Sequence, residues 1–271
     1  MMYGANLPST SCVVPLARDF CSGASPRWFE GLLWFSDTLG EAVHTVDLRG
    51  SMTTLPLPGR RPCGLGFRPD GSLLVASSHD RQILRYDGET TTTLVDLSNL
   101  GAGELGDLVV DALGRAYVGC GAEAAGFIVQ VNPDDTVTIA AEQVNPRGLA
   151  IAPDRRLLVA DRATRQLLSF GIAQDGRLTQ RQVFSTELDG PPGGIAVDAS
   201  GAVWTAMPLA REFQRIVAGG EVTDRLLMGS RIPIACTLGG QEDSMLFLLS
   251  NVGVGDRTQT RLDVTRVGVV T

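Results

Sequence analysis

Short apolar segments recur along the chain, and each is followed by a polar turn and a second apolar segment. The clearest copies are PCGLGFRPDGSLLVAS (62–77), LGDLVVDALGRAYVGC (105–120), NPRGLAIAPDRRLLVAD (145–161) and PPGGIAVDASGAVWTAM (191–207). Two looser copies flank them, ASPRWFEGLLWFSD (24–37) and PIACTLGGQEDSMLFLLS (233–250). Apolar runs of this length, bounded by Pro, Asp and Gly, are typical of β-strands joined by tight turns. Each copy therefore predicts a β-hairpin.

The spacing of the copies predicts a β-propeller. Their anchor residues lie 39 to 46 residues apart and are Ser25, Gly64, Asp107, Gly148, Gly194 and Ala235. This is the period of a propeller blade. Segments such as QILRYDG (82–88) and TTTLVDL (91–97) supply a third and a fourth strand, and no stretch has a sustained helical period. We predict an all-β fold over residues 1–271, a single six-bladed β-propeller domain with four-stranded blades.

The N-terminal segment CVVPLARDF (12–20) precedes the first copy and has no place in it. A propeller closes radially, which removes long exposed sheet edges. We therefore expect the last blade to take a strand from this segment, so that N- and C-terminal strands close the ring together.

Composition narrows the functional classes. The chain is 44% hydrophobic with a mean hydropathy of +0.10, which favours a folded core. Its net charge is −7 and it has no basic cluster, so a nucleic-acid partner is not expected. The apolar runs are only strand-sized, so we expect no membrane span. All 23 basic residues are arginine, and without lysine the chain cannot use a Schiff-base lysine or a Walker-type phosphate loop.

The five cysteines are widely spaced and form no CxxC motif. This argues against a disulfide scaffold or a zinc site, and it favours a reducing compartment. The N-terminus has no basic region followed by a continuous apolar run, so a secretory signal is not expected. A cytoplasmic location is the resulting expectation.

Four segments carry a family resemblance: SPRWFEGLLWFSD (25–37), GLAIAPDRRLLVAD (148–161), GGIAVDASGAVW (193–204) and ACTLGG (235–240). Together they resemble the SMP-30/gluconolactonase/luciferin-regenerating-enzyme family over nearly the whole chain. The resemblance implies a six-bladed propeller that holds one divalent cation, usually calcium or zinc, at the mouth of the central channel. In such proteins the cation polarises a substrate carbonyl or activates water, typically to hydrolyse sugar lactones or related esters.

The resemblance also locates the cation ligands, a Glu, two Asn and an Asp, at the start of four inner strands. The matching positions here are Ala24, Gly106, Arg147 and Gly193. A hard dication needs several oxygen ligands, and these residues supply none. We therefore expect neither a metal nor another cofactor. The same position in the other two blades is Cys63 and Ile234, and these six residues are predicted to line the ligand pocket.

Arg147 is the most informative of these positions. One hypothesis is that its guanidinium stands in place of the metal and binds a carboxylate or a developing oxyanion. Where the family often has a substrate-contacting Arg, this chain has Glu104, so one charge has been lost and another gained. The alternative is that Arg147 forms a structural salt bridge with Glu104 or Asp107, because buried charges are normally paired.

Three residues are candidates for acid/base work: Glu104, Asp107 and His79. His79 could be oriented by Asp80 or another carboxylate, or could simply be a solvated turn residue. Asp107 could instead serve turn hydrogen bonds. Cys63 is a potential nucleophile or a small core-like cysteine. His44 lies inside a predicted strand and is expected to pack.

The loops after each second strand should emerge on the same face as the ring, and they add further candidate site residues: Asp37, His79, Asp80, Cys120, Glu123, Asp161, Arg162, Met207, Arg211, Glu212 and Asn251. The turn at 154–156 is expected on the opposite face as a solvated charge cluster.

Two functions remain open. The first is a metal-independent enzyme that acts on a small, largely apolar molecule with a carbonyl or carboxylate, by acid/base isomerisation, elimination, cyclisation, or lactone or ester hydrolysis. The second is a non-catalytic small-molecule sensor or carrier. Both predict a small-molecule partner, and a monomer or homodimer.

Overall fold

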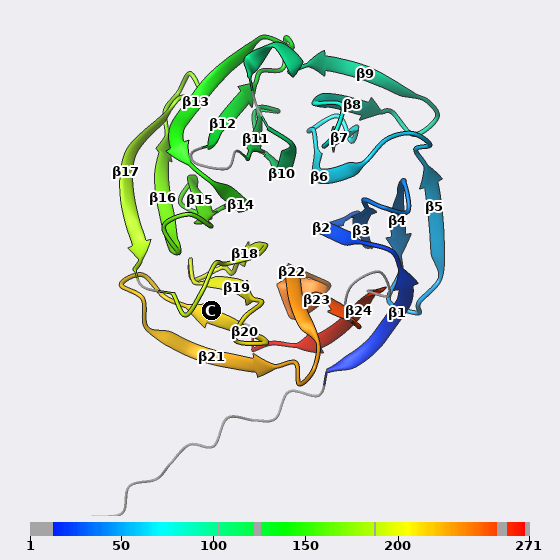
Figure 1. Cartoon of the computed structure of the whole chain (residues 1–271), viewed down its shortest axis with the longest axis vertical. Coiled ribbons are helices and arrows are strands. Elements are labelled where there is room, and N and C mark those ends of the chain that lie inside the picture. Colours follow the sequence, from blue (N-terminus) through cyan, green and yellow to red (C-terminus); the bar gives the residue numbers. More distant parts are fainter. Residues whose placement is uncertain (1–12, 102, 122–125, 187, 254–258, 269–271) are drawn as a thin grey trace, which may run out of the picture.

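The computed structural model describes residues 13–101, 103–121, 126–186, 188–253 and 259–268. Six four-stranded antiparallel sheets stand around a central axis (Figure 1), with the first strand of each repeat innermost. The predicted six-bladed β-propeller with four-stranded blades is confirmed.

The strands follow the sequence repeats. Blade 1 contains β2 (Gly23–Phe29), β3 (Leu32–Asp37), β4 (Ala42–Val46) and β5 (Met52–Pro56). Blade 2 contains β6 (Pro62–Phe67), β7 (Leu73–Ser77), β8 (Gln82–Tyr86) and β9 (Thr91–Asp96). Blade 3 contains β10 (Leu105–Val110), β11 (Ala116–Cys120), β12 (Gly126–Val131) and β13 (Val137–Val144). Blade 4 contains β14 (Pro146–Ile151), β15 (Arg156–Asp161), β16 (Gln166–Ile172) and β17 (Leu178–Ser185). Blade 5 contains β18 (Ile195–Val197), β19 (Val203–Met207), β20 (Glu212–Ile216) and β21 (Val222–Leu227). Two short 3₁₀ turns, η1 (Ser98–Leu100) and η2 (Gln241–Asp243), complete the described elements. No helix in the described part of the chain could cross a bilayer.

Blade 6 closes the ring as predicted. Its strands β22 (Ile232–Gly239), β23 (Met245–Val252) and β24 (Gln259–Arg266) are joined by β1 (Val14–Phe20), which pairs antiparallel with β24. In Figure 1 the blue N-terminal strand lies beside the red C-terminal one. The backbone N–H of Gly23 in blade 1 donates a hydrogen bond to Thr260 Oγ1 in blade 6 (2.8 Å), which links the two blades.

The core lies between neighbouring blades. Each apolar cluster combines side chains from two adjacent sheets, as in the cluster that joins Leu74 of blade 2 to Leu108 and Val118 of blade 3. Alternating residues of each strand face one neighbour or the other, so every blade buries both faces.

Glycine at the anchor position lets the inner strands approach closely. A Cβ on Gly64 would lie 2.5 Å from the Leu108 backbone nitrogen, and one on Gly148 would lie 2.8 Å from the Gly193 carbonyl oxygen. A side chain at either of these two positions would push neighbouring blades apart, which explains the glycine in these two copies of the phrase.

Candidate ligand-binding cavity at the propeller axis

A cavity of about 740 Å³ opens at the axis, where the inner strands begin. All six blades contribute to its wall. Many lining side chains are polar: Ser22, Ser25, Arg27, Thr38, Ser78, Glu104, Asp107, Asn145, Arg147, Arg162 and Asn251. The cavity is therefore more polar than the six predicted ring residues alone suggest.

In blades 2, 3, 4 and 6 a shift in strand register coincides with the ring residue. In blade 4, Pro146 pairs with Asp161 and Gly148 with Ala160, which leaves Arg147 outside the regular ladder. Such bulges re-aim side chains. The equivalent residue in four other blades also lines the cavity, and these residues are Ala24, Cys63, Gly106 and Ile234.

Gly193 is the exception to the predicted ring. A Cβ at this position would lie 2.5 Å from the carbonyl oxygen of Ile234, because β22 packs directly against it. The cavity wall of blade 5 is formed by its neighbours Gly194 and Ile195 instead.

A second tier of residues lies above the ring. In blades 1, 3 and 4 the residue after the second strand donates its backbone N–H to the carbonyl two residues before the ring position: Thr38 to Ser22, Gly121 to Glu104 and Arg162 to Asn145, at 2.9–3.1 Å. The loops therefore emerge on the ring face, as expected. Thr38, Gly121, Arg162 and Asn251 all line the cavity.

Besides Gly193, four predicted substrate-binding residues do not line the cavity, and the loop candidate Glu123 lies outside the described residues. Cys120 and Met207 are the last residues of their second strands, and their side chains are buried in the cores between blades. Asp37, in the same position, accepts the backbone N–H groups of Cys21, Ser22 and Gly40. Successive strand residues face opposite sides, so a slip of one residue along the chain separates core from cavity. Arg211 is exposed and donates to the carbonyl of Ser230 (2.5 Å).

Arg27 and Asp107 form a buried ion pair at the floor of the cavity. Arg27 Nη2 lies 2.6 Å from Asp107 Oδ1, and Arg27 also donates to the carbonyls of Leu65 and Leu108. Asp107 Oδ1 further accepts from Ser25 Oγ (2.5 Å), and Oδ2 accepts the Leu149 amide (2.8 Å). This pair bridges blades 1 to 4. It gives Asp107 a structural role and removes it from the acid/base candidates. Arg27 was not among the predicted residues, although a charge inside an apolar inner strand is a usable signal.

Arg147 and Arg162 present their guanidinium groups to the same cavity without such partners. Both residues are exposed to solvent, and neither side chain has a hydrogen bond or ion pair to a residue in the described part of the chain. The predicted alternative, a salt bridge from Arg147 to Glu104 or Asp107, is not formed: Asp107 is held by Arg27, and Glu104 lies near His79.

Glu104 and His79 sit together at the rim. The Glu104 Oε1 to His79 Nδ1 distance is 4.0 Å, and the two side chains are 68% and 70% exposed. Asp80, the other proposed partner of His79, is occupied by Arg60 Nη1 (2.7 Å) and Ser77 Oγ (2.9 Å). The hydrogen bond from Arg60 is the main reason why the pKa of Asp80 is lowered. Glu104 is thus the carboxylate left near His79. As expected, His44 is buried, in β4.

Burial raises the pKa of the Cys63 thiol to about 11, and the positive charge of Arg147 only partly offsets this effect. The thiol is therefore protonated at neutral pH, which opposes a nucleophilic role.

The ring does not fit a divalent cation. Its side chains offer no carboxylate, Arg147 adds a positive charge, and Gly193 has no room for a side chain. Asp107 is fully engaged by protein donors. Across the described ranges, no three His, Cys, Asp or Glu side chains are grouped so that they could hold a metal.

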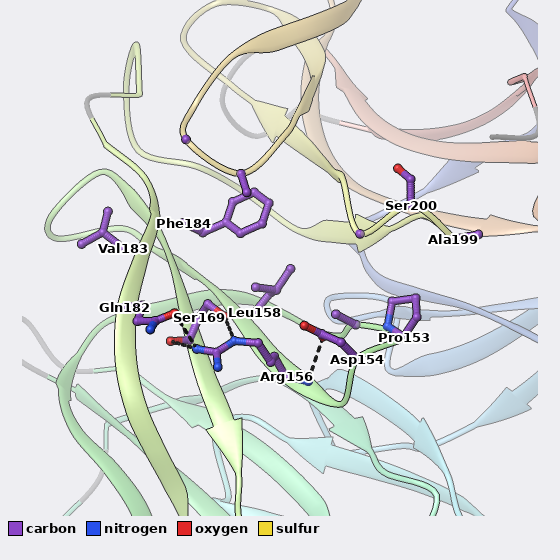
Figure 2. Close-up of a pocket in the computed structure, with 14 residues that line it drawn as sticks. Pro153, Asp154, Arg156, Leu158, Ser169, Gln182, Val183, Phe184, Ala199 and Ser200 are labelled. Carbon is purple, nitrogen blue, oxygen red and sulfur yellow. Dashed lines mark hydrogen bonds between the residues drawn. The ribbon is translucent and has the colours of Figure 1, made fainter. Parts of the chain in front are cut away.

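A second cavity, of about 430 Å³, lies between blades 4 and 5 (Figure 2). Its Arg156 donates to Ser169 Oγ (2.6 Å) and Gln182 Oε1 (3.2 Å), so this residue is half-buried and bonded, not solvated as expected. None of the predicted site residues lines it.

The described residues form a six-bladed propeller with a cavity on its axis. The family model described as "SMP-30/Gluconolactonase/LRE-like region" matches residues 22–252, so the chain belongs to this family.

Named relatives agree with this membership, and a solved structure agrees with the fold. The chain is 28% identical over 243 residues to 6-deoxy-6-sulfogluconolactonase of Pseudomonas putida, covering 84% of this chain and 83% of the relative. It is 24% identical over 245 residues to pentonolactonase XacC of Haloferax volcanii, covering 86% and 83%. The structure of a calcium-binding protein, regucalcin, from Agrobacterium tumefaciens superposes with a TM-score of 0.81 at 21% identity, covering 95% of each chain.

Proposed function

We propose that this chain hydrolyses a small lactone or related ester in its axial cavity without a resident metal ion. Its membership of the family and the lactonase names of two relatives support the reaction class. One observation carries the metal-free assignment: the guanidinium of Arg147, which has no partner among the described residues, belongs to a ring that lacks carboxylates.

The chemistry assigns three roles. Water attacks the carbonyl carbon, and Arg147 stabilises the negative charge that develops on the carbonyl oxygen through charge-assisted hydrogen bonds. Glu104, supported by His79, accepts the proton of the attacking water. The ring C–O bond then breaks, and the leaving oxygen takes that proton, which gives a hydroxy acid.

A binding protein is the second candidate. One feature favours it: the buried acid, Asp107, is committed to Arg27, while Glu104 and His79 are well exposed. A carrier would use the positive charge of Arg147 to bind its ligand and would need no general base.

Assays of lactone opening by titration of released acid separate the two functions. We expect turnover that survives extensive chelation and is lost in Arg147→Met. Turnover that disappears on chelation and returns with calcium or zinc would refute the metal-free assignment. Binding of lactones or their acids without any turnover would establish the carrier.

A further inference from the structure

Blade 4 presents two guanidinium groups to the cavity at two levels. Arg147 lies at the register shift of β14, and Arg162 follows the end of β15. The Arg162 backbone N–H donates to the Asn145 carbonyl (3.0 Å), so its loop lies over the start of β14. Both residues line the cavity.

The described acids around this cavity do not neutralise these two charges. Glu104 lies beside His79 on the blade 2 and 3 side, and Asp107 is bonded to Arg27. Asp161, next to Arg162, is buried and accepts the backbone N–H groups of Asn145 and Ala163. Two like charges thus share one wall with no carboxylate among the described residues within ion-pair reach. An anion that binds here would relieve their repulsion and gain charge-assisted hydrogen bonds.

The proposed function assigns Arg147 to the reacting carbonyl oxygen, which leaves Arg162 available for another group of the substrate. We propose that Arg162 binds a permanent anionic substituent of the substrate, a carboxylate, sulfonate or phosphate, while Arg147 faces the reacting carbonyl. The preferred substrate is then an anionic lactone that spans the cavity from blade 4 towards Glu104. That the substrate is a lactone rests on the proposed function. Binding of an anion by Arg162 does not require the chain to hydrolyse anything.

The test compares a neutral six-carbon lactone, gluconolactone, with the same lactone carrying a sulfonate, phosphate or carboxylate at carbon 6. The wild-type chain should have the higher kcat/KM for the anionic substrates. Arg162→Met should lower kcat/KM for these by about tenfold to a hundredfold, as expected for a lost hydrogen bond to a charged group, mainly through KM. Its kcat/KM for the neutral lactone should not change.

Two further variants control for charge and folding. Arg162→Lys keeps the charge and should retain part of the preference. Arg181→Met removes an exposed arginine of the same blade, on the outer strand β17, and should change neither substrate's kinetics. Added salt should narrow the preference of the wild type because it screens exposed charges. The three anions tested separately identify which group the site takes.

Calorimetric binding of the open-chain sulfonated acid separates this inference from the proposed function. If no lactone is hydrolysed but this acid binds and Arg162→Met weakens it, the anion site stands and the hydrolase proposal fails. If neutral and anionic lactones are hydrolysed equally well, or Arg162→Met slows both equally, the anion site is refuted and lactone hydrolysis stands. Absence of both turnover and binding refutes the anion site as well.

Discussion

The same cavity is lined by three arginines that differ in their partners. Arg27 is bonded to other groups of the protein, whereas Arg147 and Arg162 are not bonded through their side chains to any described residue. The Arg27 side chain is 16% exposed, and its donors are bonded to Asp107 and to backbone carbonyls of three blades. Arg147 and Arg162 face the open mouth without partners among the described residues.

The difference teaches how to separate charges that hold the fold from charges that remain free for a ligand. A buried guanidinium must satisfy its donors within the protein, because leaving them unpaired costs several kcal/mol. An exposed guanidinium is solvated and contributes little to stability. Substitutions in the two groups should therefore affect different measurements.

The largest expected effect is on the buried pair. Asp107→Ala leaves Arg27 buried without its carboxylate and should lower the free energy of unfolding by about 3–5 kcal/mol. Urea denaturation measures this. Glu104→Gln, an exposed neighbour, should stay within about 0.5 kcal/mol of the wild type. A loss below 1 kcal/mol in Asp107→Ala would mean that the pair does not hold the blades together.

Arg147→Met should show the reverse behaviour. Loss of the group that receives the oxyanion should reduce kcat by about 10²–10³-fold. The urea midpoint should hardly move, because Arg147 has no protein partner in the described chain. A stability loss as large as that of Asp107→Ala would place Arg147 with the structural group instead.

Glu104→Gln should reduce kcat by about 100-fold, the lower end of the range for a general base. His79→Asn should cost less, because His79 does not line the cavity itself. Steady-state kinetics on one lactone measure both variants. A larger loss in His79→Asn than in Glu104→Gln would reverse the two roles.

The smallest expected effect is on the alkylation rate of Cys63. The charge of Arg147 lowers the pKa of this thiol, so the rate responds to the position of Arg147. Burial raises its pKa to about 11, so alkylation by iodoacetamide should be slow at pH 8 and accelerate towards pH 11 as thiolate forms. Arg147→Met removes a charge that favours the thiolate, so the rate at a given pH should fall. Mass spectrometry of the peptide that contains Cys63 gives the alkylation rate. The exposed Cys21 serves as an internal control for the reactivity of iodoacetamide at each pH. An unchanged rate would mean that Arg147 points away from the ring.

Much of the fold was predictable from the sequence. The repeat period and the hairpin pattern predict six blades, and the unplaced segment before the first copy predicts the closing strand β1. The site was predicted in part. Arg147 and four other ring residues line the cavity, whereas Asp37 and Cys120 each stand one residue before a lining position. A one-residue offset cannot be resolved from hydrophobicity, since both positions precede a turn.

The sequence by itself determined the propeller, the repeated glycines and the absence of carboxylates from the ring. These features are local, because strand periodicity and turn chemistry act over a few residues. Only the tertiary structure decided which arginines are paired. Arg27 meets Asp107 across 80 residues of sequence, and that contact exists because radial closure brings the inner strands of blades 1 and 3 to the same axis.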